Sequence, residues 1–217
     1  MNLQLRHKGS SIVGAAALMA LVLGAAAPLA QEGVKETEQF IKAGAKTSES
    51  VGEAKAQMQA TLTNYGDLLG KSATDMKDSY KKLVKNIKDT DEKIADAREH
   101  VTKMQETGKV YFDGRSATIK KIADPALQAQ AQERLAASQK GFDGVLASLR
   151  QTRDSLDPVR KELGDQVKYL ESDLSPSGTA SLKSQAEKTK AGASAVFSKL
   201  DDAVRTANAY FEGLRAK

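Results

Sequence analysis

Only one histidine lies beyond residue 30, and it is the first candidate for catalysis or metal binding. His100 stands four residues after Asp96, so on a helix the imidazole and the carboxylate share one face. A helical di-metal site needs glutamates together with two Glu-x-x-His motifs, and the sequence offers no second histidine pair. It also suggests no serine that forms a triad with His100. We interpret His100 as a residue at the edge of a helix face, predict no catalytic, cofactor-binding or metal-binding residues, and expect no enzymatic activity.

The chain of 217 residues has no cysteine. Disulfides, thiolate metal sites and covalent haem attachment are therefore excluded. A lipid-anchored bacterial export signal is excluded as well, because it needs cysteine at the cleavage point. An exported chain of this composition has to be stabilised by packing alone.

Five closely spaced lysines form the most basic stretch and could bind phosphate or an anionic lipid. They alternate with acidic residues such as Asp78 and Asp89, so we interpret the stretch as a solvated helix face. The whole chain has 33 basic and 28 acidic residues, an excess that is only a weak indication of an anionic partner. We expect no nucleic acid partner for an exported protein. The five residues are Lys77, Lys81, Lys82, Lys85 and Lys88.

The first thirty residues have the pattern of a secretory signal peptide. Arg6 and Lys8 give a positive start, Ile12–Leu23 is apolar, and small residues follow. We predict cleavage after Ala30, with cleavage about one turn earlier as the alternative because Pro28 sits close to that site. An uncleaved membrane anchor is a further alternative, but the apolar run is short and rich in alanine. We therefore expect a periplasmic protein with a signal peptide at residues 1–30 and no lipid anchor.

The elements that would position any site are helices, and the clearest one follows Asp124-Pro125. An aspartate before proline favours a helix start, and Ser175-Pro176 repeats the signal 51 residues later. Between the two, apolar residues recur every seven positions, as in one face of a coiled coil. Pro158 interrupts this repeat without shifting it, which predicts one kinked helix rather than two. The repeat consists of Leu135, Phe142, Leu149, Leu156, Leu163 and Leu170.

Two more helices, one before and one after this central helix in the sequence, show the same kind of apolar spacing. One runs from about 72 to 122 and the other from about 177 to 215, with the central helix at 125–172. We predict an all-α fold in which residues 71–217 form an elongated antiparallel bundle of three long coiled-coil-like helices. On the outer face of the first helix, we predict ion pairs between residues four apart. These are Asp78 with Lys82, Asp89 with Lys93, and Glu99 with Lys103.

The N-terminal segment, residues 31–70, is a less regular helix with a polar beginning. Its apolar stripe, Met58, Leu62, Tyr65 and Leu69, needs cover, which favours folding back onto the bundle over protruding from it. The loosely amphipathic stretch is also compatible with peripheral contact to a membrane. We expect a monomer if the segment folds back and a dimer through the stripe if it does not. In either case, deletion of 31–69 is expected to leave a helical monomer.

Several short motifs carry a resemblance to a known family. They are Asp75-Met76 with Tyr80 and Leu83, Tyr111-Phe112-Asp113, Leu156-Asp157-Pro158-Val159, Asp165-Gln166-Val167-Lys168-Tyr169-Leu170, Leu174, and Ala180-Ser181-Leu182. In these motifs, over roughly residues 50–215, the chain resembles the bacterial exported proteins of the domain of unknown function 2959 family. Similar proteins tend to be acidic and carry Lys-His-Asn where this chain has Glu171-Ser172-Asp173. The resemblance implies an exported helical protein and supplies no mechanism.

Long apolar seams, charged outer faces and the absence of converging catalytic groups favour a non-enzymatic role. Our first hypothesis is a periplasmic interaction or structural protein that binds a protein partner through its helix faces. The second is a periplasmic chaperone or carrier that shields an apolar client or lipid between separable helices.

Overall fold

A computed structural model describes residues 26–72 and 74–216 of the chain, with side chains from Gly33 onward. In this described part there are four long helices and no strand. The fold is therefore an all-α helical bundle, as predicted, with the N-terminal segment forming a fourth helix. The helices are α1 (Ala26–Leu69), α2 (Met76–Ile119), α3 (Pro125–Ser172) and α4 (Pro176–Arg215).

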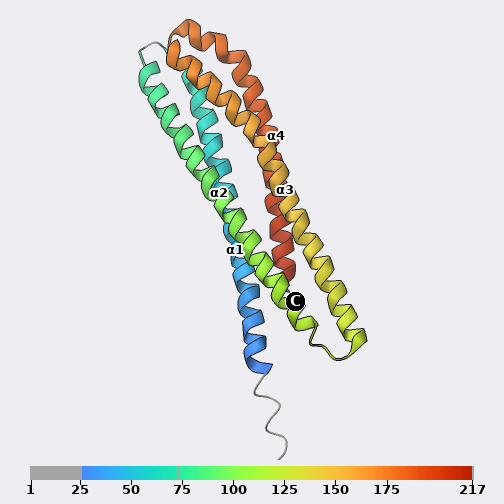
Figure 1. Cartoon of the computed structure of the whole chain (residues 1–217). Coiled ribbons are helices and arrows are strands. Elements are labelled where there is room, and N and C mark those ends of the chain that lie inside the picture. The colour runs from blue at the N-terminus through green and yellow to red at the C-terminus, as the bar shows by residue number, and fades with distance from the viewer. Residues whose placement is uncertain (1–25, 73, 217) are drawn as a thin grey trace, which may run out of the picture.

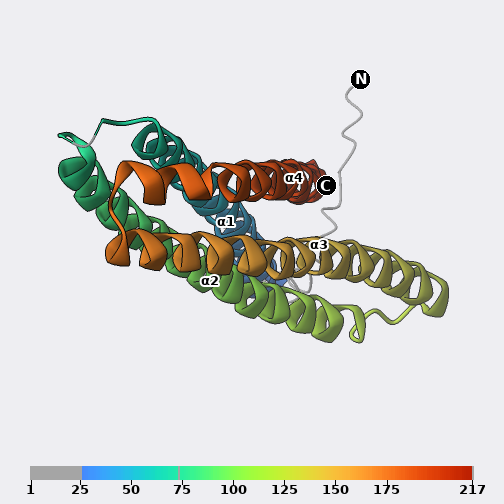
Figure 2. The same cartoon turned by 90° about the horizontal axis from the view of Figure 1, so that it is seen from above.

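Successive helices run antiparallel and form an elongated bundle (Figure 1). Helix α1 packs against α2 and α4, and α3 packs against the same two helices. The order around the bundle is therefore α1, α2, α3, α4, with α1 and α3 on one diagonal. The start of α3 extends beyond the end of α4 in both views (Figures 1 and 2), and Leu127 in this extension is 58% exposed.

The two proline boundaries form helix caps of the predicted kind. The Asp124 carboxylate accepts hydrogen bonds from the backbone N–H groups of Ala126 and Leu127, at 2.8 and 3.0 Å. The Ser175 hydroxyl accepts one from the Gly178 N–H at 3.1 Å. In each case a side-chain oxygen satisfies N–H groups that the first helical turn leaves unpaired, and the following proline fits the first helical position. These caps fix the ends of the two sharp turns that bring α3 and α4 alongside the other helices.

Helix α3 is continuous through Pro158, and its seven-residue repeat faces the core. Leu149, Leu156, Leu163 and Leu170 are all buried, and Leu170 has no exposed surface. The predictions of one helix through Pro158 and of buried leucines are confirmed, and the bend at Pro158 stays a prediction. A seven-residue period keeps one stripe of the helix turned toward its partners from Leu135 to Leu170, a length of roughly 53 Å.

Helix α1 folds back along the bundle and is as long as α2, with 44 residues. Within its polar first half, Phe40 has no exposed surface, and its ring lies 4.8 to 6.2 Å, centroid to centroid, from five other aromatic rings. Aromatic pairs at these separations stabilise beyond the area they bury. Because α1 supplies part of the common core, deletion of 31–69 would expose that core, which argues against a stable three-helix remainder. The rings around Phe40 are Tyr111, Phe112, Phe142, Tyr210 and Phe211.

Polar side chains cross the core at the opposite half of the bundle. The Tyr65 hydroxyl on α1 donates to Gln166 Oε1 on α3 at 2.7 Å, and the Gln166 amide donates to Thr189 Oγ1 on α4 at 2.8 Å. Between α1 and α2, the hydroxyls of Thr61 and Thr90 lie 2.8 Å apart. Hydrogen-bonded polar groups of this kind favour one register among several that apolar packing alone would allow.

The predicted signal peptide, residues 1–30, lies mostly outside the described residues. Its last five residues, from Ala26, form the first turn and a half of α1. Cleavage after Ala30 remains a prediction, and it would shorten α1 at its free end only. Among the described helices, none combines the length and the apolar character needed to cross a membrane.

Candidate functional site

The residues that the sequence suggested as candidates for chemistry lie on the surface of α2. His100 is half-buried at the edge of the helix, and its backbone carbonyl accepts a 3.0 Å hydrogen bond from the Thr47 hydroxyl on α1. Asp96 is exposed. Across residues 26–72 and 74–216, no group of three or more histidine, aspartate or glutamate side chains is arranged to hold a metal ion. His100 therefore lies at the edge of a helix face, as we interpreted it.

The five lysines of the basic stretch are all exposed. Lys81 pairs with Asp78 at 3.4 Å and Lys88 with Glu92 at 3.7 Å, which fits a solvated face. The three ion pairs predicted on α2 do not form among the described residues. Lys93 instead binds Glu53 on α1 at 2.7 Å. Spacing along one helix cannot reveal that the neighbouring helix presents a carboxylate at the same level.

A cavity at mid-length of the bundle has a volume of about 530 Å³ and is lined by all four helices. We call it the cleft. Its inner wall is apolar, while its rim comes from α2 and α3 and is polar and charged. The apolar wall consists of Val51, Ala54, Met58, Ile94, Ala97, Val101, Leu149, Leu156, Phe197 and Leu200. The rim consists of Arg98, Thr102, Gln105, Arg150, Arg153, Asp154 and Asp157.

Small side chains in two facing helices explain why space remains there. The Thr61–Thr90 contact sets the level at which α1 and α2 face one another. One heptad earlier on α1 stands Ala54, and one heptad later on α2 stands Ala97, so antiparallel packing brings the two alanines to the same level. Alanine leaves a gap where larger side chains fill the neighbouring layers, and both residues line the cleft.

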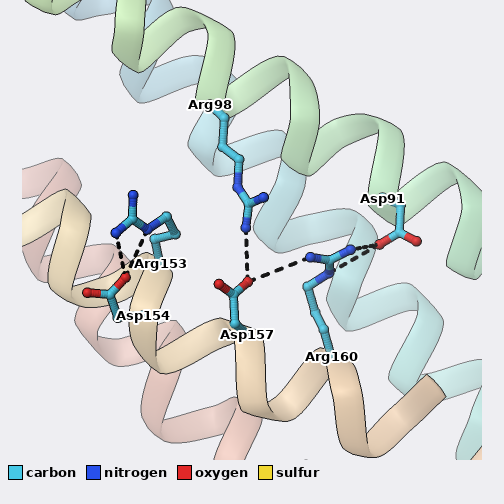
Figure 3. Close-up of polar contacts among 6 residues, drawn as sticks. All are labelled: Asp91, Arg98, Arg153, Asp154, Asp157 and Arg160. Atoms are coloured by element: carbon cyan, nitrogen blue, oxygen red, sulfur yellow. Dashed lines mark hydrogen bonds and ion pairs between the residues drawn. The ribbon is translucent and has the colours of Figure 1, made fainter. Parts of the chain in front are cut away.

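The rim of the cleft is bridged by ion pairs between α2 and α3 (Figure 3). Arg98 on α2 donates to Asp157 Oδ1 on α3 at 2.9 Å, and the Arg160 guanidinium lies 3.6 Å from the same oxygen. Arg160 also donates to Asp91 on α2, through Nε at 3.1 Å and through a second, shorter contact. On α3 itself, Arg153 donates to Asp154 at 2.7 and 2.9 Å.

These bridges are weak because water reaches them. The side chains of Arg98 and Asp157 are 48% and 51% exposed, and exposed ion pairs contribute about 0–1 kcal/mol each. The α2–α3 pairing is also the loosest of the four helix pairings. Apolar burial, in contrast, contributes roughly 1.5–3 kcal/mol for each large side chain. The α2–α3 side is therefore the one at which the bundle is least costly to open.

The rim carries an excess of positive charge. Arg98 and Arg153 are each matched by an aspartate, whereas Arg150 is exposed and makes no ion pair within the described part of the chain. At the back of the cleft, Lys55 is bound by Asp201 of α4 at 2.5 Å. The mouth between α2 and α3 therefore presents one guanidinium with its donors free for an incoming anion.

The sequence motifs that carry the family resemblance lie around this region and in the core. Leu156-Asp157-Pro158-Val159 supplies the rim aspartate and the cleft-lining leucine, and Gln166 of the next motif makes the hydrogen bonds that cross the core. The stretch in which the chain departs from similar proteins forms the α3–α4 turn. There the Ser172 hydroxyl donates to the Tyr169 carbonyl at 2.8 Å, and Asp173 accepts from Ser175 at 2.6 Å.

Sequence reasoning did not find the cleft. Ala54 and Ala97 are two alanines in apolar stripes. They indicate a cavity only when the helix register, which places them opposite each other, is known. Arg98 and Asp157 are 59 positions apart, and no sequence pattern pairs them.

A family model described as a protein of unknown function (DUF2959) matches residues 28–214. Neither the curated proteins nor the solved structures give a match. The matched range includes nearly all of α1 and runs to the last turn of α4, so the whole bundle is the family unit. The chain belongs to this family of proteins of unknown function.

Proposed function

We propose that this member of the domain of unknown function 2959 family is a non-enzymatic periplasmic carrier that shields an apolar client in the cleft between α2 and α3. One observation carries the proposal: an open cleft of about 530 Å³, with an apolar inner wall and a polar rim, lies behind the loosest helix pairing of the bundle. Small-molecule sites are typically cavities of about 300–1,000 Å³ with apolar walls and a few polar groups. The cleft has both properties.

A protein partner bound to the outer helix faces is less well supported. Its docking surface would need a contiguous apolar patch of a few hundred Å². Among the described residues, the exposed large apolar side chains are Val34 on α1, Val84 and Val110 on α2, and Leu127 and Tyr169 on α3. Val84 and Val110 lie roughly 40 Å apart along α2, and Leu127 and Tyr169 lie roughly 63 Å apart along α3. Single exposed apolar residues are ordinary features of protein surfaces.

Binding of a neutral apolar fluorophore, N-phenyl-1-naphthylamine, tests the proposal. The chain has no tryptophan, so the probe signal is measured against a low background. We expect saturable binding of one probe per chain, which Ala97→Phe abolishes by filling the cleft. Ala117→Phe, on the exposed surface of the same helix, is the control and should leave binding unchanged. Absence of saturable binding, or equal binding by the Ala97→Phe variant, would overturn the proposal.

The periplasmic location rests on the predicted signal peptide and has its own test. Osmotic shock of cells that express the full chain should release the protein, and mass spectrometry should place its first residue at Gln31. Retention with the membrane, or an intact residue 1–30 segment in the cytoplasmic fraction, would contradict it.

A further inference from the structure

We infer that the client of the cleft is a single-chain anionic amphiphile of the fatty-acid class, with its hydrocarbon chain against the apolar wall and its carboxylate at Arg150. This inference rests on the proposed function and adds the chemical class of the ligand. It follows from the dimensions of the cleft and from the charges at its mouth.

The dimensions of the cleft accommodate an extended hydrocarbon chain. The cleft-lining residues of α2 run from Ile94 to Gln105, a rise of about 16 Å. A volume of about 530 Å³ spread over that length gives a mean cross-section of about 33 Å². The cleft is therefore long and narrow, a shape that accommodates one extended hydrocarbon chain.

The composition of the wall agrees with such an occupant. The small side chains of Ala54 and Ala97 make the cleft deep. Met58 adds a flexible apolar side chain and Phe197 adds a flat aromatic ring. Thr152 is the buried polar residue at the wall, and its hydroxyl is satisfied by the Ser148 carbonyl at 2.9 Å. The Thr152 hydroxyl therefore keeps its hydrogen bond when the hydrocarbon chain enters.

The charges at the mouth select an anionic head group. The rim carries three arginines against two aspartates, and both aspartates are already bound by arginine. A cationic head group would have to displace a guanidinium, whereas a carboxylate meets Arg150, which has no ion pair in the described chain. Arginine presents a planar fork of donors that matches a carboxylate.

Displacement of the bound fluorophore by three ligands with the same chain tests the inference on the mature protein. The ligands are dodecanoate, dodecanol and dodecylamine, each below its aggregation concentration. We expect dodecanoate to bind more tightly than dodecanol by about three- to tenfold, and dodecylamine to bind most weakly, because a carboxylate gains a charge-assisted contact that the other two head groups lack. The preference for dodecanoate should shrink as salt rises.

Two arginine variants on α3 locate the head group. Arg150→Gln should weaken dodecanoate to the level of dodecanol and leave dodecanol unchanged. Arg134→Gln, an exposed arginine on the same helix outside the cleft, is the control and should change neither.

The outcomes separate the inference from the function on which it rests. Equal affinities for dodecanoate and dodecanol, or no effect of Arg150→Gln, would overturn the anionic class while the carrier function stands. Failure of all three ligands and of the fluorophore would overturn both. Displacement of the fluorophore by an acidic amphipathic peptide, and not by dodecanoate, would replace the small amphiphile with a protein partner.

Discussion

The Tyr65 hydroxyl donates a 2.7 Å hydrogen bond to Gln166 Oε1 across the diagonal between α1 and α3, two helices whose backbones are not in contact. Tyr65 has no exposed surface and Gln166 is 8% exposed. The Gln166 amide is held in turn by Thr189 of α4. One glutamine, bonded through both its Oε1 and its Nε2 atom, therefore links three helices and fixes their relative register.

Removal of the Tyr65 hydroxyl should destabilise the bundle. Tyr65→Phe leaves Gln166 Oε1 buried without its donor, and such an unsatisfied group costs about 1–3 kcal/mol. Chemical denaturation of the variant measures the change in unfolding free energy. Tyr80→Phe is the control, because Tyr80 is only partly buried and should stay within about 0.5 kcal/mol of the parent. Equal stabilities of the two variants would mean that the hydrogen bond does not hold the register.

Alkaline pH should destabilise the protein through two tyrosines, the buried Tyr65 and the partly buried Tyr210. Burial raises the pKa of Tyr65 and of Tyr210 to about 12, from an ordinary value near 10. Because the folded-state pKa is the higher one, this contribution to stability is complete below about pH 10 and is lost as pH rises toward about 12. Tyrosinate absorbance, read at each pH just after a rapid pH jump, should show two tyrosines that ionise only near pH 12. Tyr65→Phe and Tyr210→Phe should each remove one tyrosine from this high-pH step. A step of unchanged size in either variant would contradict the assignment.

Two glycines of α1 should respond to alanine in opposite directions. A Cβ at Gly44 would overlap the Phe211 ring, whereas one at Gly52 has nothing within 4 Å. Gly52→Ala should therefore gain about 1 kcal/mol of helix stability. Gly44→Ala has the same intrinsic gain but must move a ring of the Phe40 cluster, and overpacking costs typically about 1–3 kcal/mol. Melting temperatures should rise for Gly52→Ala and fall for Gly44→Ala. A rise in both would show that the ring relocates freely.

The mature protein should be monomeric. The apolar stripe of α1 that needed cover is buried within the chain, with Met58, Leu62, Tyr65 and Leu69 each at most 7% exposed. No second copy is then required to shield it. Sedimentation equilibrium over a range of protein concentrations should give one mass near that of a single chain. A stable dimer would mean that another face, such as the start of α3 beyond the end of α4, is apolar enough to associate.

Much of the fold could be predicted because its signals are local. The heptads of α3, the proline boundaries at Asp124 and Ser175 and the burial of Leu163 all depend on residues close in sequence. The role of Phe40 was missed, since a single aromatic residue in a polar stretch has no periodic neighbours to indicate a buried face. Its burial depends on the other five rings arriving from α2, α3 and α4.

The cleft was beyond prediction for a related reason. Its volume arises from the register that places Ala54 opposite Ala97, and its rim arises from α2 and α3 lying side by side at that level. Lys93 illustrates the same limit, because the predicted partner was Asp89 on its own helix and the observed partner is Glu53 on α1. The volume of the cleft, the composition of its rim and the partner of Lys93 all depend on contacts between helices.

Methionine-methyl NMR of the mature protein tests the binding cleft most directly. Beyond residue 30 the chain has only three methionines, and of these Met58 lines the cleft, while Met76 and Met104 are buried elsewhere in the core. Titration with N-phenyl-1-naphthylamine should shift the Met58 methyl signal to saturation at one ligand per chain and leave Met76 in place. A saturable shift of Met76 with Met58 unmoved, or no saturable shift at all, would contradict a client site between α2 and α3.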